Sequence, residues 1–191
     1  IYLFLYFSLL LGFYFNEDFA GGHVQDYREH NNMACYFEIS FIEAFLNYGK
    51  IKTGTIGHSP IYMVFFLIIK KISFNETFAK LINLHLSLLI PYFFYLCLKI
   101  KYKIKINDIK ILLPALIFLS PYFRSASIWL ADENVSLIFL SICFYFFLKF
   151  EKSKKKKLSD IFLNVLFLAL AAYIRPIYSL FGIYFFVRYY F

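Results

Sequence analysis

Long runs of apolar and aromatic residues, separated by two short lysine clusters, constrain the fold of this chain more than any other feature. Of its 191 residues, 61% are hydrophobic and 24% are aromatic. A soluble domain of this size would expose too much apolar surface to water. The sequence therefore predicts an all-α fold, a polytopic transmembrane helical bundle with a long external first loop that contains juxtamembrane helices.

The lysine clusters set the expected orientation in the membrane. They hold more than half of the 20 basic residues, at Lys99, Lys101, Lys103, Lys105 and Lys110, and at Lys149, Lys152 and Lys154 to Lys157. Both clusters flank hydrophobic runs, so the positive-inside rule places them on the cytoplasmic side. The formal net charge of +8 therefore has a membrane explanation, and we expect no nucleic-acid partner.

The hydrophobic runs divide the chain into segments. We expect spans at residues 1–15, 78–100, 111–123, 135–150 and 158–174, followed by another segment at 177–191. The external loop, residues 16–77, should contain two interfacial helices at 33–48 and 61–72. Asn31 or Asn32 would cap the first of these and Gly49 would end it. His85 and Asn83, inside the span 78–100, are expected to hydrogen-bond between helices.

The segment 61–72 decides the topology. It has about a dozen apolar residues, whereas a helix that crosses a bilayer needs about 20. If it crossed, the first lysine cluster would lie outside, against the charge rule. We therefore expect it to lie along the outer interface or to re-enter it.

Both ends of the chain lie inside hydrophobic runs, and the first residue is not Met. We therefore expect the N-terminal part of a longer protein, with the first segment as a signal anchor. Cys35, Cys97 and Cys143 show neither a disulfide framework nor metal-ligand spacing. Apolar packing is their expected role.

In this topology the unusual polar groups collect on the external side, which points to an active site there. They are Glu17, Asp18, Asp26, His30, His58, Arg124, Asp132, Glu133 and Arg175. Many of them belong to the stretch 15–60, the longest polar passage of the chain. A solvated loop between two spans is the alternative interpretation of that stretch.

Several short motifs resemble those of the GT-C membrane glycosyltransferases, including glycosyltransferase family 39. The first external loop resembles the acidic motifs of that group in Asp26-Tyr27-Arg28-Glu29-His30 and, in reversed order, in Asn16-Glu17-Asp18. The stretch His58-Ser59-Pro60-Ile61-Tyr62 is similar to the His-Pro-Pro-Leu-Tyr stretch of the mannosyltransferases. Later turns resemble the group in Leu130-Ala131-Asp132-Glu133-Asn134 and Tyr173-Ile174-Arg175-Pro176. Protein O-mannosyltransferases and the lipid A aminoarabinose transferase are members.

The resemblance implies sugar transfer from a polyprenyl-phosphate donor to a hydroxyl of a glycan, lipid or protein acceptor. Such a reaction needs a base for the acceptor proton and a cation for the departing phosphate. Asp26 is our first candidate for the base, followed by Asp18 and then Glu17. His30, one helical turn after Asp26, would orient it or contact the donor phosphate.

Arginine suits the phosphate because its planar fork matches phosphate oxygens. Arg175 is the first candidate and Arg124 the second, with snorkelling at the interface as the alternative for both. Asp132 and Glu133 would bind a divalent cation or the acceptor sugar, unless they only complement a helix dipole. His58 is expected to fix the loop. The sequence requires no cofactor, although a divalent metal is compatible with it.

Two other functions stay open. A polysaccharide flippase, polymerase or other transporter would also be polytopic, but it should carry charged or broken helices at mid-membrane. A non-enzymatic membrane scaffold would tolerate loss of charge from the acidic loop. The Phe, Ile, Lys, Asn and Tyr bias suggests an AT-rich genome, so a bacterial inner membrane with the site facing the periplasm is the expected location.

Overall fold

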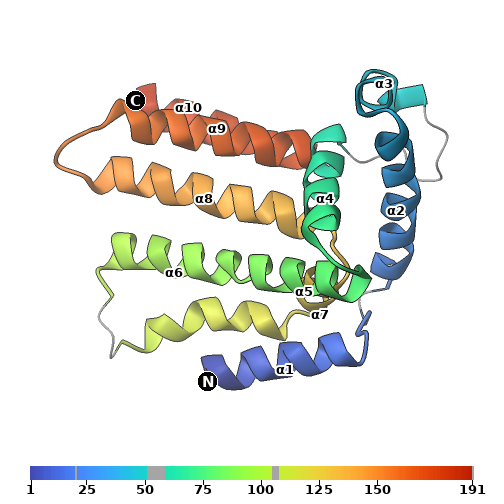
Figure 1. Ribbon diagram of the computed structural model, residues 1–191. Coiled ribbons are helices and arrows are strands. Elements are labelled where there is room, and N and C mark those ends of the chain that lie inside the picture. Colours follow the sequence, from blue (N-terminus) through green and yellow to red (C-terminus); the bar gives the residue numbers. More distant parts are fainter. Residues whose placement is uncertain (20, 51–58, 105–107, 191) are drawn as a thin grey trace.

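The computed structural model describes residues 1–19, 21–50, 59–104 and 108–190, and every regular element in these residues is a helix. The helices that run side by side in Figure 1 are α1 (Tyr2–Tyr14), α5 (Glu76–Ser87), α6 (Leu89–Tyr102), the 3-10 helix η2 (Ile109–Leu119), α8 (Asp132–Lys152), α9 (Leu158–Ile174) and α10 (Leu180–Tyr190). They form a bundle with one free end and one covered end.

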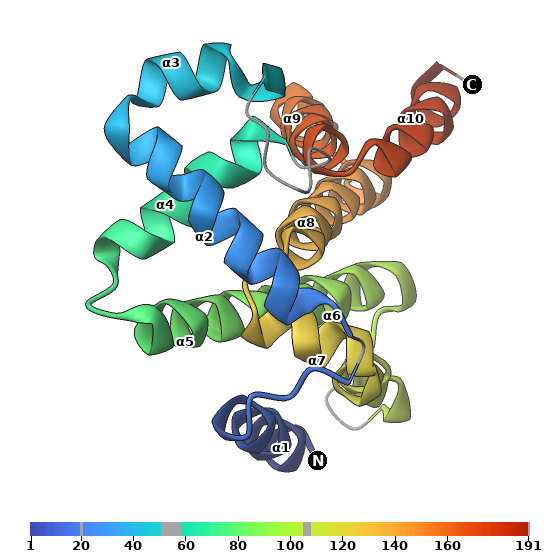
Figure 2. The same cartoon turned by 90° about the vertical axis from the view of Figure 1, so that its right-hand side faces the viewer.

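The remaining elements lie at the covered end of this bundle. They are α2 (His23–Ile39), α3 (Phe41–Leu46), the 3-10 helix η1 (Tyr48–Lys50), α4 (Pro60–Ile72), α7 (Pro121–Ile128) and the 3-10 helix η3 (Pro176–Ser179). Figure 2 shows this end face-on, with α2 running diagonally across it. The segments expected as interfacial helices therefore do lie across the bundle rather than along it.

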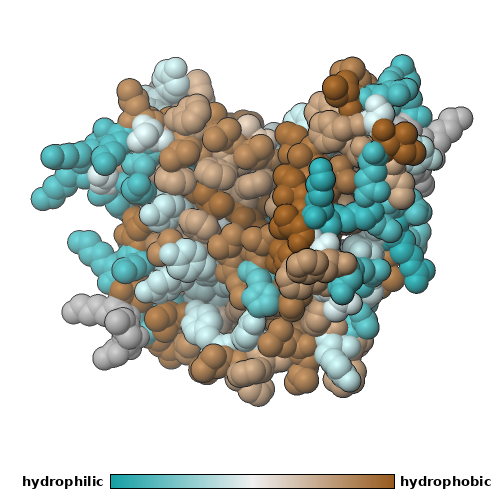
Figure 3. Space-filling model, in the orientation of Figure 1, coloured by the Kyte–Doolittle hydropathy of each residue, from teal (hydrophilic) through white to brown (hydrophobic). Residues whose placement is uncertain are grey.

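Within the described residues, two helices are long and apolar enough to cross a membrane. One is the continuous stretch Glu76–Tyr102, formed by α5 and α6, and the other is α8. The pair of η2 and α7 would be a third, but it is bent by 66°. The helices α1 and α9 are apolar but shorter. On the face seen in Figure 3, a broad apolar zone separates polar surfaces at the two ends of the bundle.

The lysine-rich helix ends lie together, as the charge rule requires. The C-terminal ends of α6 and α8 point to the same end of the bundle, opposite α2 and α4 (Figure 1). Lys149 from α8 contacts Asp160 of α9 at 3.0 Å beside this end. Helix α2 and the starts of α4 and α8 are at the other end, so the polar segment of the first loop lies opposite the lysine-rich helix ends.

The apolar face of α4 anchors the covering layer. Tyr62, Met63, Phe66 and Ile69 of this helix are buried. They recur at the spacing of one helical face, and α4 packs against α2, α5 and α9. Ser59 caps the helix by accepting a hydrogen bond from the backbone nitrogen of Ile61 at 3.2 Å, and Pro60 begins it.

Buried amides tie the bundle to the covering layer. The Nδ2 atom of Asn83 donates to the carbonyl of Ser127 at 2.6 Å, which joins α5 to α7. His85 contacts the hydroxyl of Tyr6 at 2.9 Å, which joins α5 to α1. The expectation that His85 and Asn83 form interhelical hydrogen bonds is therefore confirmed.

The helix predicted at residues 33–48 has other limits. Helix α2 begins at His23 and ends at Ile39, and α3 follows after Ser40. The start differs because Gly22, with φ of 92°, provides a left-handed N-terminal cap. Asn31 and Asn32 lie inside the helix and do not cap it.

The span predicted at 111–123 is not one regular α-helix, although the bent pair of η2 and α7 is still a candidate span. Residues Ile109–Leu119 form a 3-10 helix that contains Pro114. Proline has no N–H and clashes with the preceding turn, so it disfavours a regular α-helix. The chain then bends at Ser120, and α7 follows the bend.

Candidate functional site

A buried ion pair holds the end of α1 against α7. The guanidinium of Arg124 donates to both carboxylate oxygens of Glu17, at 2.6 Å each. Arg124 also donates to the hydroxyl and the carbonyl of Ser8, at 3.1 and 3.0 Å. The indole of Trp129 donates to the Glu17 carbonyl at 3.0 Å. Because each group already has a partner, this geometry favours a structural role for Glu17 and Arg124.

The second acid of the loop lies at the start of α2. Asp18 Oδ1 is 3.6 Å from Nδ1 of His23, and Oδ2 accepts a 3.4 Å hydrogen bond from the backbone nitrogen of Val24. His23 is buried and packs edge-on against Tyr122, with ring centres 4.9 Å apart. A carboxylate at this position complements the helix N-terminus. Asp18 therefore fixes where α2 begins.

Asp26 lies one turn further along α2 and differs from the other two acids. Its side chain is half-buried. No hydrogen bond or ion pair joins its carboxylate to another described residue. A general base must be able to reach the proton that it accepts, and a carboxylate already held by a cation is less able to do so. The first sequence candidate is thus the acid that remains available.

Tyr62 lies between the helix that carries Asp26 and the start of α8. The ring of His30 is 4.7 Å from its ring, and its hydroxyl donates to the carbonyl of Leu130. Burial raises the pKa of Tyr62 well above its ordinary value, and the negative charges of Asp132, Glu133 and Asp26 raise it further. The charges of all three acids therefore act on this one tyrosine.

The bend before α8 places a group of two acids and one arginine near Tyr62. Leu130 has φ of 49°, a left-handed conformation that is uncommon for a residue other than glycine. Asp132 and Glu133 follow in the first turn of α8, and both pair with the Nη2 atom of Arg175 at the end of α9. The distance to Asp132 Oδ1 is 2.7 Å. Two carboxylates and one guanidinium give this group a net negative charge.

We define the Tyr62 cluster as Asp26, His30, Tyr62, Asp132, Glu133 and Arg175. It unites five of the residues that the sequence analysis proposed, and it adds Tyr62. The pair of Glu17 and Arg124 is not part of this cluster, whereas Asp18 and His23 approach it through Tyr122, which packs on His23 and interacts with Glu133. His58 lies outside the described residues. Tyr62 was present in the quoted motif, but only its burial on α4 shows that it belongs to the site.

Arg175 keeps part of its hydrogen-bonding capacity. Its side chain is 35% exposed. Its Nε atom is buried and has no hydrogen-bond partner among the described residues. Arginine has five N–H donors, so a further anion can bind beside the two carboxylates. Within the same residues, no group of three His, Cys, Asp or Glu side chains has the arrangement of a metal site.

The described residues define an all-helical protein with two helices that are long and apolar enough to cross a membrane and with an ionisable cluster at one end of the bundle. Comparisons with protein-family models, curated proteins and solved structures find no match to this chain. A fold class alone does not determine a reaction. The functional conclusion therefore depends on the chemistry of the Tyr62 cluster.

Proposed function

We propose that this chain is part of a GT-C type membrane glycosyltransferase, multi-pass and located in a bacterial inner membrane. It would transfer a sugar from a polyprenyl-phosphate donor to a hydroxyl of a glycan, lipid or protein acceptor on the periplasmic face. The observation that carries the proposal is the position of Asp26. It is half-buried, its carboxylate has no hydrogen bond or ion pair to another described residue, and its charge acts on Tyr62, as do the charges of Asp132 and Glu133, which pair with Arg175.

In the proposed reaction the Asp26 carboxylate accepts the proton of the acceptor hydroxyl. The acceptor oxygen forms a bond to the anomeric carbon of the donor sugar, and the bond from that carbon to the phosphate oxygen breaks. The polyprenyl phosphate leaves with the electron pair. Arg175 stabilises the charge that develops on this phosphate, because a fixed cation is worth more in a site with little water.

Asp132 and Glu133 have a positioning role in this scheme. They hold the Arg175 guanidinium from one side, at 2.7 Å in the case of Asp132. Their charges also favour a cation, so a divalent metal is compatible with the site, as is a sugar whose hydroxyls donate to them. His30 packs on Tyr62 behind Asp26 and restricts the rotation of that part of α2.

The test is an envelope glycan profile of cells that carry the full-length gene, with wild type, Asp26→Asn and Asp18→Asn at matched membrane levels. We expect Asp26→Asn to abolish the glycan. Glu38→Gln is the matched control, since Glu38 is also on α2 but pairs with Lys70 at 3.0 Å on the surface. It should leave the glycan unchanged.

Other outcomes reassign the function. Loss of the glycan in Asp18→Asn alone would keep the transferase and move the base to Asp18. If neither substitution changes any glycan that depends on the gene, catalysis by this loop is excluded. A transporter or a membrane scaffold would then explain the fold.

A further inference from the structure

A polar cavity lies on the other flank of α2, away from Asp26. It has a volume of about 310 Å³ and is lined by Arg28, Asn31 and Asn32 of α2, Glu76 and Lys80 of α5, and Trp129. Arg28 and Asn31 are about one turn apart and share one side of the helix. Asp26 precedes Arg28 by two positions, so the two side chains leave the helix in directions about 200° apart around its axis. The cavity is therefore separate from the Tyr62 cluster.

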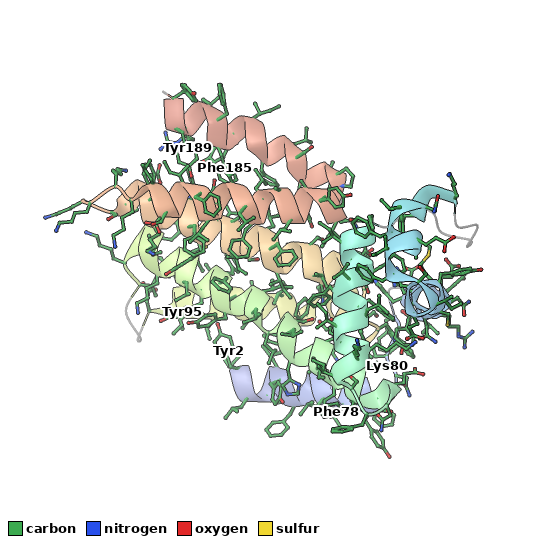
Figure 4. All side chains as sticks on the ribbon, turned by 45° about the horizontal axis from the view of Figure 1, so that its top comes forward. Tyr2, Phe78, Lys80, Tyr95, Phe185 and Tyr189 are labelled. Atoms are coloured by element: carbon green, nitrogen blue, oxygen red, sulfur yellow. The ribbon has the colours of Figure 1, made fainter. Side chains whose placement is uncertain are left out.

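Lys80 is the unusual residue of this cavity. Only 7% of the residue is exposed, and its Nζ atom lies 3.7 Å from the ring centre of Trp129 and 5.0 Å from that of Tyr27. In Figure 4 it lies at the covered end of the bundle, on the side of α2. Lysines are almost never this buried without a strong partner.

The partner of Lys80 leaves most of the ammonium unused. Glu76 Oε1 accepts a 2.6 Å hydrogen bond, but the Glu76 side chain is 57% exposed and is solvated by water. An ammonium has three N–H donors. The rings of Trp129 and Tyr27 attract its charge by cation–π contact but provide no oxygen or nitrogen acceptor. A desolvated cation with spare donors therefore lines a cavity large enough for a small molecule.

The charges of the lining favour an anion. Arg28 and Lys80 are positive and Glu76 is negative, so the cavity carries a net positive charge. The amides of Asn31 and Asn32 add donors for oxygen atoms on the opposite wall. Arginine and lysine together match the oxygens of a phosphate, the former with its planar fork and the latter as a point charge. One oxyanion alone would not fill this volume and would leave the rings of Tyr27 and Trp129, which also line the cavity, without a contact.

We propose that this cavity binds the phosphate of a small phosphate ester, with Lys80 and Arg28 on the phosphate oxygens and the ester group against Tyr27 and Trp129. The same chemistry is present in a phospholipid headgroup and in a soluble glycerol phosphate. The site is independent of the transfer reaction proposed above, because none of its residues belongs to the Tyr62 cluster.

The experiment uses the full-length protein in neutral detergent and glycerol 3-phosphate as the probe. Binding is followed by calorimetry and by the fluorescence of Trp129, the sole tryptophan of this sequence. We expect saturable binding that sodium chloride at equal ionic strength does not reproduce. Lys80→Met keeps the apolar stem and removes the charge, and Arg28→Gln removes the second cation. Each should weaken binding about tenfold or more.

Glu76→Gln gives a prediction of opposite sign. It removes the carboxylate that competes for Lys80, so glycerol 3-phosphate should bind several-fold more tightly. Arg28 and Glu76 are both exposed, so these two variants test the proposal even if Lys80→Met fails to fold. Lys71→Gln, at the exposed end of α4, is the control and should not change binding.

A second arm identifies the source of the phosphate. In nanodiscs, a Lys80-dependent fluorescence change with phosphatidylglycerol but not with phosphatidylcholine supports a lipid headgroup. Binding of glycerol 3-phosphate alone supports a soluble ester. If neither probe binds, or if binding is the same in Arg28→Gln, Glu76→Gln and wild type, the proposal is wrong.

Discussion

The guanidinium of Arg124 binds both carboxylate oxygens of Glu17, although 107 positions separate the two residues in the chain. The pair is largely buried, with 14% of the arginine side chain and 6% of the glutamate side chain exposed. Removing one partner of a buried pair leaves an uncompensated charge, which costs more than an intact pair contributes. The joint between α1 and α7 therefore depends on both residues.

We expect Arg124→Gln to lower the free energy of unfolding by about 3 kcal/mol, because it leaves Glu17 buried and unpaired. Unfolding in mixed detergent micelles measures this. Arg188→Gln is the control, since Arg188 pairs with Glu151 on the exposed end of α10 and such pairs contribute little. Equal destabilisation by the two substitutions would contradict the role given to Arg124.

Gly12 provides the space in which this pair is packed. A Cβ atom at this position would collide with Glu17 Oε2 and lie 2.8 Å from Arg124 Nη2. Alanine is the better helix former by about 1 kcal/mol, but overpacking costs about 1 to 3 kcal/mol. We expect Gly12→Ala to be destabilising. In Gly182→Ala the nearest atom would be 3.8 Å away, so that control should be neutral or slightly stabilising.

Local patterns determined which parts of the fold were predictable. The limits of α9 agree with the prediction of residues 158–174, because Arg175-Pro176 and the lysine cluster end the apolar run on both sides. The start of α4 follows from Ser59 and Pro60. The start of α2 was missed because it depends on two glycines with positive φ, Gly21 and Gly22, and a glycine pair does not reveal its backbone angles.

The site was predictable only as a set of residues on one side. The expected order of the spans put the acids and arginines at one end of the bundle. It did not indicate which acid pairs with which arginine. Glu17 and Asp26 are both acids in the same loop, and only the fold shows that one is paired with Arg124 and the other is available. The burial of Lys80 over Trp129 has no signal in the sequence.

Arg175 offers a test of the phosphate site that depends on the proposed transferase activity. Arg175→Lys keeps the positive charge but loses the planar fork. We expect the glycan to decrease at least tenfold, while the protein still inserts in the membrane, because one N–H fork no longer bridges Asp132 and the phosphate. Arg188→Lys is the conservative control and should keep the wild-type profile. An unchanged profile in Arg175→Lys would show that only charge matters at this position.

Asn134 links three elements near the start of α8. Its Nδ2 atom donates to the hydroxyls of Ser127 and Ser87, at 2.8 and 3.1 Å, and its residue is 2% exposed. We expect Asn134→Leu to lower stability by about 1 to 2 kcal/mol, as for polar contacts between membrane helices. In Ser141→Ala only a bond within α8 to Leu137 is lost, so the effect there should be smaller. Unfolding in mixed micelles compares the two.

The three cysteines test the orientation of the bundle in the membrane. Cys35, on α2, is exposed, whereas Cys97 and Cys143 are buried. If the end that carries α2 faces outward, a membrane-impermeant maleimide should label intact cells at Cys35, and Cys35→Ser should remove the label. Lys154→Cys in that background places a thiol in the exposed turn between α8 and α9.

This second thiol should react only after the membrane is permeabilised, because the positive-inside rule keeps the lysine-rich turn in the cytoplasm. Helix α2 and the turn between α8 and α9 are at opposite ends of the bundle in Figure 1, so opposite accessibility of the two thiols requires intervening helices to cross the bilayer. Labelling of both thiols in intact cells would mean that the bundle does not span the membrane as proposed. Labelling of Lys154→Cys alone would reverse the orientation and place the Tyr62 cluster on the cytoplasmic side, where the proposed periplasmic reaction cannot occur.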